Sequence, residues 1–169
     1  MKKSTFLISI ILIFKLSIAQ ISVSSNASFI STKQSNLFET GIGGNIAIGI
    51  LLKERVNIEV GINNFWLNSA VDNHTLSDLS LNSKYIFLNN DIRPYLAMGI
   101  AYYRTKFDQP IGEPYKDYYF GVKPSVGLLI DTKLIDNLFV NIAYSYNYAL
   151  NTSKDSFNEF DIGVFYYFE

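Results

Sequence analysis

The chain contains one histidine, His74, which lies between two aspartates, Asp72 and Asp78. A histidine beside a carboxylate can act as a general base that activates water for hydrolysis. No second histidine and no His-x-Ser pattern accompany it, so the sequence favours a solvated histidine in a polar loop. We therefore assign no catalytic residue and expect no metal or cofactor site.

A second chemical group is the basic pair Arg104 and Lys106. It continues the parity of an alternating stretch that ends in Tyr102. Basic residues just beyond an aromatic side chain at a membrane surface can contact the phosphates of lipid or lipopolysaccharide. The alternative is ordinary interfacial charge, with the alkyl stem along the surface and the charged head in water. The sequence leaves both interpretations open.

A third group consists of four charges inside otherwise alternating segments: Glu59, Lys84, Lys123 and Asp161. Their surroundings are best seen at the end of the chain. The even positions from 160 to 168 are all apolar, whereas Glu159, Asp161 and Gly163 occupy the odd ones. Because successive strand residues point to opposite faces, this segment predicts a β-strand with one apolar and one polar face.

Eight such alternating segments follow one another along the chain. We expect strands over residues 21–31, 38–50, 56–66, 79–87, 94–106, 118–130, 138–150 and 158–169. Pro124 lies inside the sixth segment and predicts a bulge or a lost ladder bond. Short turns alternate with longer loops, which indicates an up-and-down order of strands.

The four charges decide which face points inward. They share the parity of the glycines and alanines, which suits a narrow lumen, whereas the apolar parity suits lipid. Outward aromatic residues also fall near both strand ends, where membrane interfaces favour them. The sequence therefore predicts an all-β fold, an eight-stranded antiparallel up-and-down transmembrane β-barrel with a side-chain-filled lumen. A soluble lipocalin-like binding barrel, with apolar residues inside, is the alternative.

Inside such a lumen an unpaired charge is costly, so opposite charges at similar depth should pair. Counting residues from the turns predicts two structural ion pairs, Glu59–Lys84 and Lys123–Asp161. Strand tilt shifts these heights, so the matching is approximate.

Residues 1–19 have the form of a secretory signal peptide, with Lys2 and Lys3 before an apolar run and small residues before a cut after Ala19. A retained N-terminal helix is the alternative. Residues 20–169 then form one barrel domain. Removal of the signal peptide takes away three of the 14 basic residues and none of the 15 acidic ones, which leaves 11 basic and 15 acidic residues in the barrel domain. This balance argues against nucleic-acid binding, and the absence of cysteine excludes disulfides and thiol chemistry.

The segment Arg93-Pro94-Tyr95-Leu96-Ala97-Met98-Gly99-Ile100-Ala101-Tyr102 resembles the "RPY-x-G-x-G" strand of the small outer-membrane β-barrel family, the OmpA/OmpX-like proteins. The aromatic end, Val164 to Phe168, fits the same pattern. The resemblance implies the outer membrane of a Gram-negative cell, with outer-membrane lipid, lipopolysaccharide and the barrel assembly machinery as partners. We expect a structural or surface-interaction role without enzymatic activity. A lipid-modifying enzyme is the alternative, and the oligomeric state stays open.

Overall fold

A computed structural model of the chain describes residues 19–34, 37–68, 73–88, 90–107, 115–150 and 156–168. The predicted signal peptide, apart from Ala19, lies outside these residues. The described residues form eight β-strands: β1 (Ala19–Gln34), β2 (Leu37–Leu52), β3 (Val56–Asn68), β4 (Asn73–Ile86), β5 (Ile92–Phe107), β6 (Tyr115–Asp131), β7 (Leu138–Ala149) and β8 (Ser156–Phe168).

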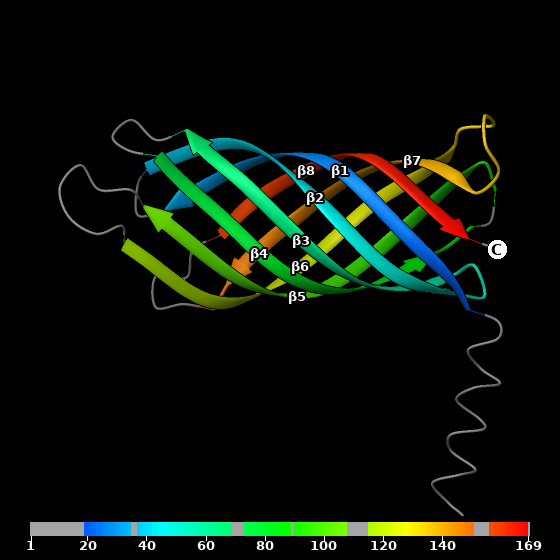
Figure 1. The fold of residues 1–169 in the computed structure, drawn as a ribbon, viewed down its shortest axis with the longest axis horizontal. Coiled ribbons are helices and arrows are strands. Elements are labelled where there is room, and N and C mark those ends of the chain that lie inside the picture. Colours follow the sequence, from blue (N-terminus) through cyan, green and yellow to red (C-terminus); the bar gives the residue numbers. More distant parts are fainter. Residues whose placement is uncertain are drawn as a thin grey trace, which may run out of the picture.

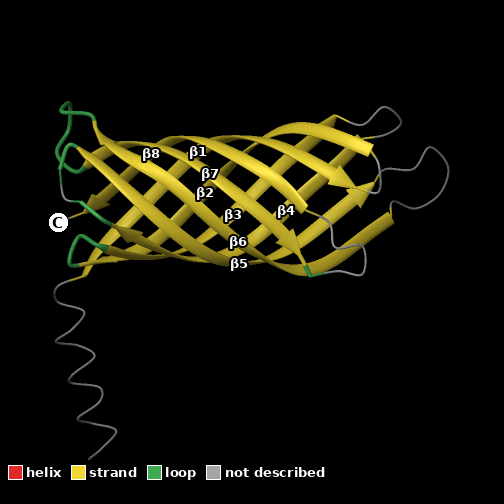
Figure 2. Cartoon of the chain, turned by 180° about the vertical axis from the view of Figure 1, so that it is seen from behind, coloured by secondary structure: helices red, strands yellow, loops and turns green. Residues whose placement is uncertain are grey.

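The strands close into one barrel in sequence order (Figure 1). Each strand pairs antiparallel with the next, and β8 returns to pair with β1, for example at Val23 and Tyr166. The strands cross the barrel axis obliquely (Figure 2). The first and last strands begin and end at the same end of the barrel, where Ile21 pairs with Phe168. We call this the terminal end and the opposite one the far end. The predicted fold is confirmed.

Short connections lie at the terminal end. Between β2 and β3, Lys53 and Glu54 both have positive φ, 50° and 56°, and the Arg55 N–H donates to the Leu52 carbonyl at 3.1 Å. Two successive left-handed residues between paired strands form a type I′ turn, whose twist matches that of the strands. The hairpin is therefore tight although neither residue is glycine or asparagine.

The connection between β6 and β7 contains another left-handed residue, Lys133. Its ammonium group pairs with the Asp91 carboxylate and lies 3.3 Å from Asp131. The bond to Asp91, followed by the one to Asp131, raises the pKa of Lys133. Both ends of the Asp91 pair are exposed to water, so the pair adds little stability.

The strand boundaries agree with the sequence expectation within a few residues except at β4. This strand begins at Asn73 rather than at Leu79, and it pairs with β3 up to Asn68. The added residues 73–78 have polar side chains on the outward face, Thr75 and Ser77. Because their outward parity is not apolar, the alternation that predicts the other strands does not extend into them.

Pro124 interrupts the ladder between β6 and β7, as the sequence predicts. Val122 pairs with Tyr148 and Ser125 with Ser145, while the two positions between them form no pair. The register is the same on both sides, so no extra residue is inserted. Proline lacks an N–H, and the ladder loses its bonds here without a bulge.

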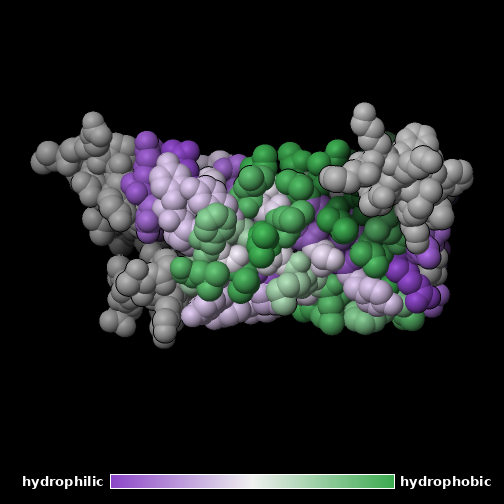
Figure 3. Space-filling view, turned by 90° about the horizontal axis from the view of Figure 1, so that it is seen from below, coloured by the Kyte–Doolittle hydropathy of each residue, from purple (hydrophilic) through white to green (hydrophobic). Residues whose placement is uncertain are grey.

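The outward face is apolar across the middle of the barrel. Figure 3 shows hydrophobic residues concentrated across the middle of the visible face and hydrophilic ones toward its two ends. Ile42 and Ile46 are each 67% exposed, and a continuous wall of such exposed apolar side chains is rare on a protein that faces water. Among the described residues, no helix is long and apolar enough to span a bilayer.

Candidate functional site

The lumen brings together the charged residues that the sequence placed on the inward parity. All four side chains point into the barrel: Glu59, Lys84, Lys123 and Asp161. The most exposed of them, Glu59, has 12% of its side chain exposed. None of them lies on the lipid face. The assigned parity of their strands is thereby correct.

The pair Glu59–Lys84 is present. The Lys84 Nζ lies 3.4 Å from the Glu59 Oε2 across neighbouring strands β4 and β3. Asn57 donates to the same carboxylate oxygen at 2.8 Å and accepts from Ser22 at 2.8 Å. The Lys84 ammonium also lies 4.7 Å from the centre of the Tyr95 ring, a cation–π contact. The charge of Lys84, on β4, therefore contacts groups on two other strands, Glu59 on β3 and Tyr95 on β5.

The predicted pair Lys123–Asp161 is wrong. The Lys123 Nζ instead lies 2.7 Å from the Glu159 Oε2, and both side chains are almost fully buried. Asp161 accepts a hydrogen bond from Ser28 on β1. Glu159 in turn accepts a second bond, from the Asn147 Nδ2 at 3.1 Å.

The register explains the correction. Val122 pairs with Tyr148, so Lys123 comes level with Asn147, which pairs with Phe157. Along β8, Glu159 lies two residues beyond Phe157 and points to the same face, whereas Asp161 lies four residues beyond it. Counting from the turns ignores the stagger that accumulates across β7 in a tilted barrel, and this stagger selects Glu159.

Asp78 is a buried charge that comes directly before the fourth strand expected from the sequence. It is on β4, and the Asn63 Nδ2 donates to its Oδ1 at 2.5 Å. It shares the even parity of Ser80, Asn82 and Lys84, so extending the period of that segment by one step would have found it.

His74 is not a solvated loop residue. It lies on β4 with its side chain 3% exposed, inward like Asp78 and four residues from it. Asp72, the other proposed partner, lies outside the described residues. Within the described parts of the chain, no group of three or more His, Asp or Glu side chains is placed to hold a metal ion.

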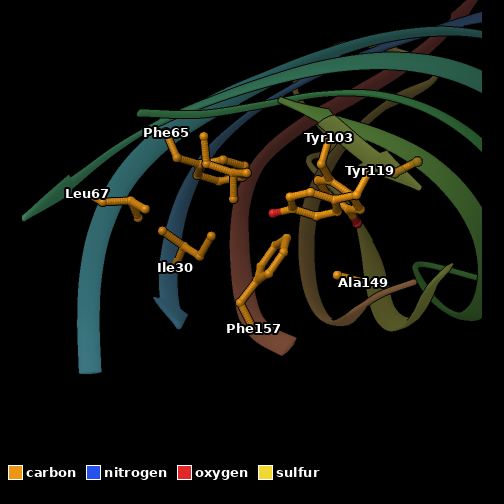
Figure 4. Packing of buried hydrophobic residues seen from close by; sticks show 9 residues of the cluster. Ile30, Phe65, Leu67, Tyr103, Tyr119, Ala149 and Phe157 are labelled. Carbon is orange, nitrogen blue, oxygen red and sulfur yellow. The ribbon is translucent and has the colours of Figure 1, made fainter. Parts of the chain in front are cut away.

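A buried cluster fills the lumen toward the far end (Figure 4). Tyr103 is at its centre, with its ring centroid 5.3 Å from that of Tyr119 and 5.4 Å from that of Phe157. The Tyr103 hydroxyl donates to Asn147 at 2.7 Å, which joins the cluster to the charged network. The members are Ile30, Phe65, Leu67, Leu76, Ala101, Tyr103, Tyr119, Ala149 and Phe157.

A second buried cluster fills the lumen toward the terminal end. Tyr95 crosses to β6 at Gly127, where a β-carbon would lie 2.5 Å from its ring, so glycine is needed for this close approach. Its hydroxyl donates to Asn141 at 2.8 Å. The members are Leu51, Ile86, Tyr95, Leu129, Phe139, Ala143, Phe165 and Tyr167.

Between the two clusters a polar cavity of about 40 Å³ remains, lined by Asn26, Glu59, Lys84, Lys123 and Asp161 among others. At about 10–15 Å³ for each water position, this is room for roughly three waters. The lumen of the described barrel thus contains a small polar pocket between two packed layers.

Arg104 and Lys106 lie on the outside of β5 near the far end. Arg104 is exposed and Lys106 half-buried. Below them the Tyr102 ring centroid is 6.1 Å from that of Tyr118 and 5.0 Å from that of Phe120. The two basic groups therefore border an outward aromatic cluster, as the sequence predicts.

Comparison with solved structures finds several small barrels of the same architecture. Neisserial surface protein A has a TM-score of 0.77 at 18% identity, over 89% of this chain and 99% of that chain. Ail of Yersinia pestis, solved in complex with the heparin analogue sucrose octasulfate, has 0.66 at 14% identity over the same shares. The N-terminal β-barrel domain of Pseudomonas aeruginosa OprF has 0.60 at 20%, again over 89% and 99%.

A scan against protein-family models gives no match, and neither does a search of curated proteins. The structural likeness, at these identities, defines the fold. The chain has the fold of the small eight-stranded outer-membrane β-barrels, and the apolar belt on its wall is the surface that such a barrel turns toward lipid.

Proposed function

We propose that this protein is an outer-membrane barrel with a structural or surface-interaction role and with no transport through its lumen. The observation that carries the proposal is the filled interior. Among the described residues, two packed layers lie across the lumen, and a cavity of about 40 Å³ lies between them. Packed layers of this kind would leave an ion or solute no continuous path.

Single-channel recording in planar bilayers tests this proposal. We expect the wild-type barrel to give no stable conductance steps. A variant that thins both layers, with Tyr103→Ala and Phe157→Ala in the far-end cluster and Phe139→Ala and Phe165→Ala in the terminal-end cluster, should conduct more than the wild type if the packed layers close the lumen. Phe120→Ala, an outward aromatic on the same barrel, is the matched control and should stay closed. Large, reproducible steps from the wild-type chain would refute the proposal.

The burial of His74 supports a role other than catalysis. A hydrolytic base must reach its substrate, and this side chain is enclosed by the barrel wall at 3% exposure. Lipid outside the wall has no contact with it. We therefore favour the non-enzymatic role over a lipid-modifying one.

We propose that both termini lie on the periplasmic side, so that the far end lies at the outer leaflet, and that Arg104 and Lys106 hold anionic headgroups there. The support is their outward position beside the Tyr102 aromatic cluster, at the level where interfacial rings meet headgroups. Arg104→Gln with Lys106→Gln should reduce the lipopolysaccharide that co-purifies with the folded barrel. Lys133→Gln, which removes an exposed charge at the terminal end, is the control and should not. Unchanged lipopolysaccharide in the double variant would show that both residues are merely solvated.

A further inference from the structure

A hollow of about 700 Å³ lies on the outward wall across β1 to β4. The outward residues at its floor are small: Ser25 on β1 and Gly44 on β2, with Ala27 paired to Gly44. Their outward neighbours are large, such as Ile46 and Ile62, each more than half exposed. The wall is recessed here because three adjacent outward positions lack the bulky side chain present around them.

The hollow has the depth of one lipid leaflet. Along β3 it extends from Val60 to Trp66. Six residues of strand span about 20 Å, which at a tilt of about 40° covers about 15 Å of membrane depth. A bilayer has a hydrocarbon core of about 30 Å, so this is roughly half of it.

The end of the hollow near Trp66 is polar. Asn64 lines it and accepts a hydrogen bond from the Ser77 hydroxyl at 2.8 Å. The asparagine amide carries two N–H donors besides this oxygen, and a polar side chain facing hydrocarbon is costly unless it is bonded. The oxygen of a lipid linkage or headgroup is the acceptor available at that depth.

The same polar edge leads to the basic pair. In the strand register Asn64 is opposite Ser77, and Ser77 is opposite Arg104. All three side chains point outward, and two strand spacings separate the first from the last, about 10 Å. The apolar hollow, which is one leaflet deep, therefore leads to the hydrogen-bonding side chains of Asn64 and Ser77 and then to the guanidinium of Arg104.

We propose that this hollow binds one acyl chain of an anionic phospholipid of the outer leaflet, with its polar linkage at Asn64 and its phosphate at Arg104. The headgroup half of this assignment rests on the proposed function, whereas the acyl half rests on the hollow alone. Ser25 and Gly44 make the room, and Trp66 borders the chain at the interface.

Native mass spectrometry of barrels extracted from equimolar phosphatidylcholine and phosphatidylglycerol vesicles tests the proposal. We expect the wild-type barrel to retain one phosphatidylglycerol molecule. Ser25→Leu fills the hollow with apolar bulk and should reduce retention about tenfold, a loss of about 1.4 kcal/mol in binding. Ser83→Leu, the same change at an exposed outward position on β4 that does not line the hollow, should retain the lipid like the wild type. Glycerol 1-phosphate, a headgroup without an acyl chain, should not displace it.

The outcomes separate the two proposals. If Ser25→Leu retains lipid as the wild type does, or if the wild type retains none, the hollow is not a lipid site. Two results would show that the hollow does not hold an acyl chain: displacement of the lipid by glycerol 1-phosphate, or a wild-type dimer that dissociates in the Ser25→Leu variant. If Ser25→Leu loses the lipid while Arg104→Gln with Lys106→Gln keeps the preference for phosphatidylglycerol, the hollow stands and the headgroup proposal fails.

Discussion

The Lys123 ammonium and the Glu159 carboxylate are both almost fully buried, 2.7 Å apart. Removing one of two buried partners leaves an uncompensated charge, which typically costs about 3–5 kcal/mol. We expect Lys123→Ala to lower the free energy of unfolding in vesicles by about that amount, measured by urea titration. Lys123→Met combined with Glu159→Gln should recover most of the loss, since neither charge remains.

The same titration distinguishes the observed pair from the one predicted by sequence. Asp161 bonds Ser28 rather than Lys123, so Asp161→Asn should cost less than Glu159→Gln. Equal or reversed costs, or a double variant no more stable than Lys123→Ala, would contradict the pairing.

For single residues, the sequence predicted correctly that each charged side chain points into the barrel, but it predicted only one of the two ion-pair partners. Parity along a strand is a local property, and it placed Glu59, Lys84, Lys123 and Asp161 inside. Which of Glu159 and Asp161 meets Lys123 depends on the stagger across β6, β7 and β8, which no local pattern contains. Glu59 and Lys84 escaped this error because their strands are direct neighbours.

At the scale of single elements, the β2–β3 hairpin contains a correctable strain. Lys53 and Glu54 both adopt left-handed backbone conformations, which cost side-chain-bearing residues about 1 kcal/mol or more. Lys53→Asn with Glu54→Gly, the residues that type I′ turns favour, should raise the free energy of unfolding by about 1 kcal/mol. The midpoint of urea unfolding measures it. Lys53→Ala, which retains a β-carbon, is the control and should give no gain. A double variant no more stable than the wild type would show that the turn is unstrained.

The elements themselves were predictable wherever one face is apolar. The end of β8 and most of β3 show this alternation, and their predicted spans agree closely with the structure. The beginning of β4 was not predictable, because Thr75 and Ser77 face outward where apolar residues were expected. These residues form strand because β3 extends to pair with them. The same extension moved His74 and Asp78 from an expected loop into the barrel.

At the scale of the whole molecule, the assignment of the apolar strand face to lipid determines which side chains point outward and which point into the lumen. The eight-stranded closed barrel was predicted from the number of alternating segments and is confirmed. Its neighbours among solved structures are outer-membrane barrels, in agreement with the predicted location. The hollow across β1 to β4 could not be predicted, because it depends on which small residues from separate strands become adjacent.

The most direct test of this assignment uses the chain's single tryptophan. Trp66 is 63% exposed on the outward face, so its fluorescence reports on what surrounds the wall. With the barrel assembled in vesicles, lipids brominated on their acyl chains should quench it strongly, and aqueous acrylamide should quench it weakly. The opposite result, strong quenching by acrylamide and none by brominated lipid, would mean that the apolar wall does not face the membrane.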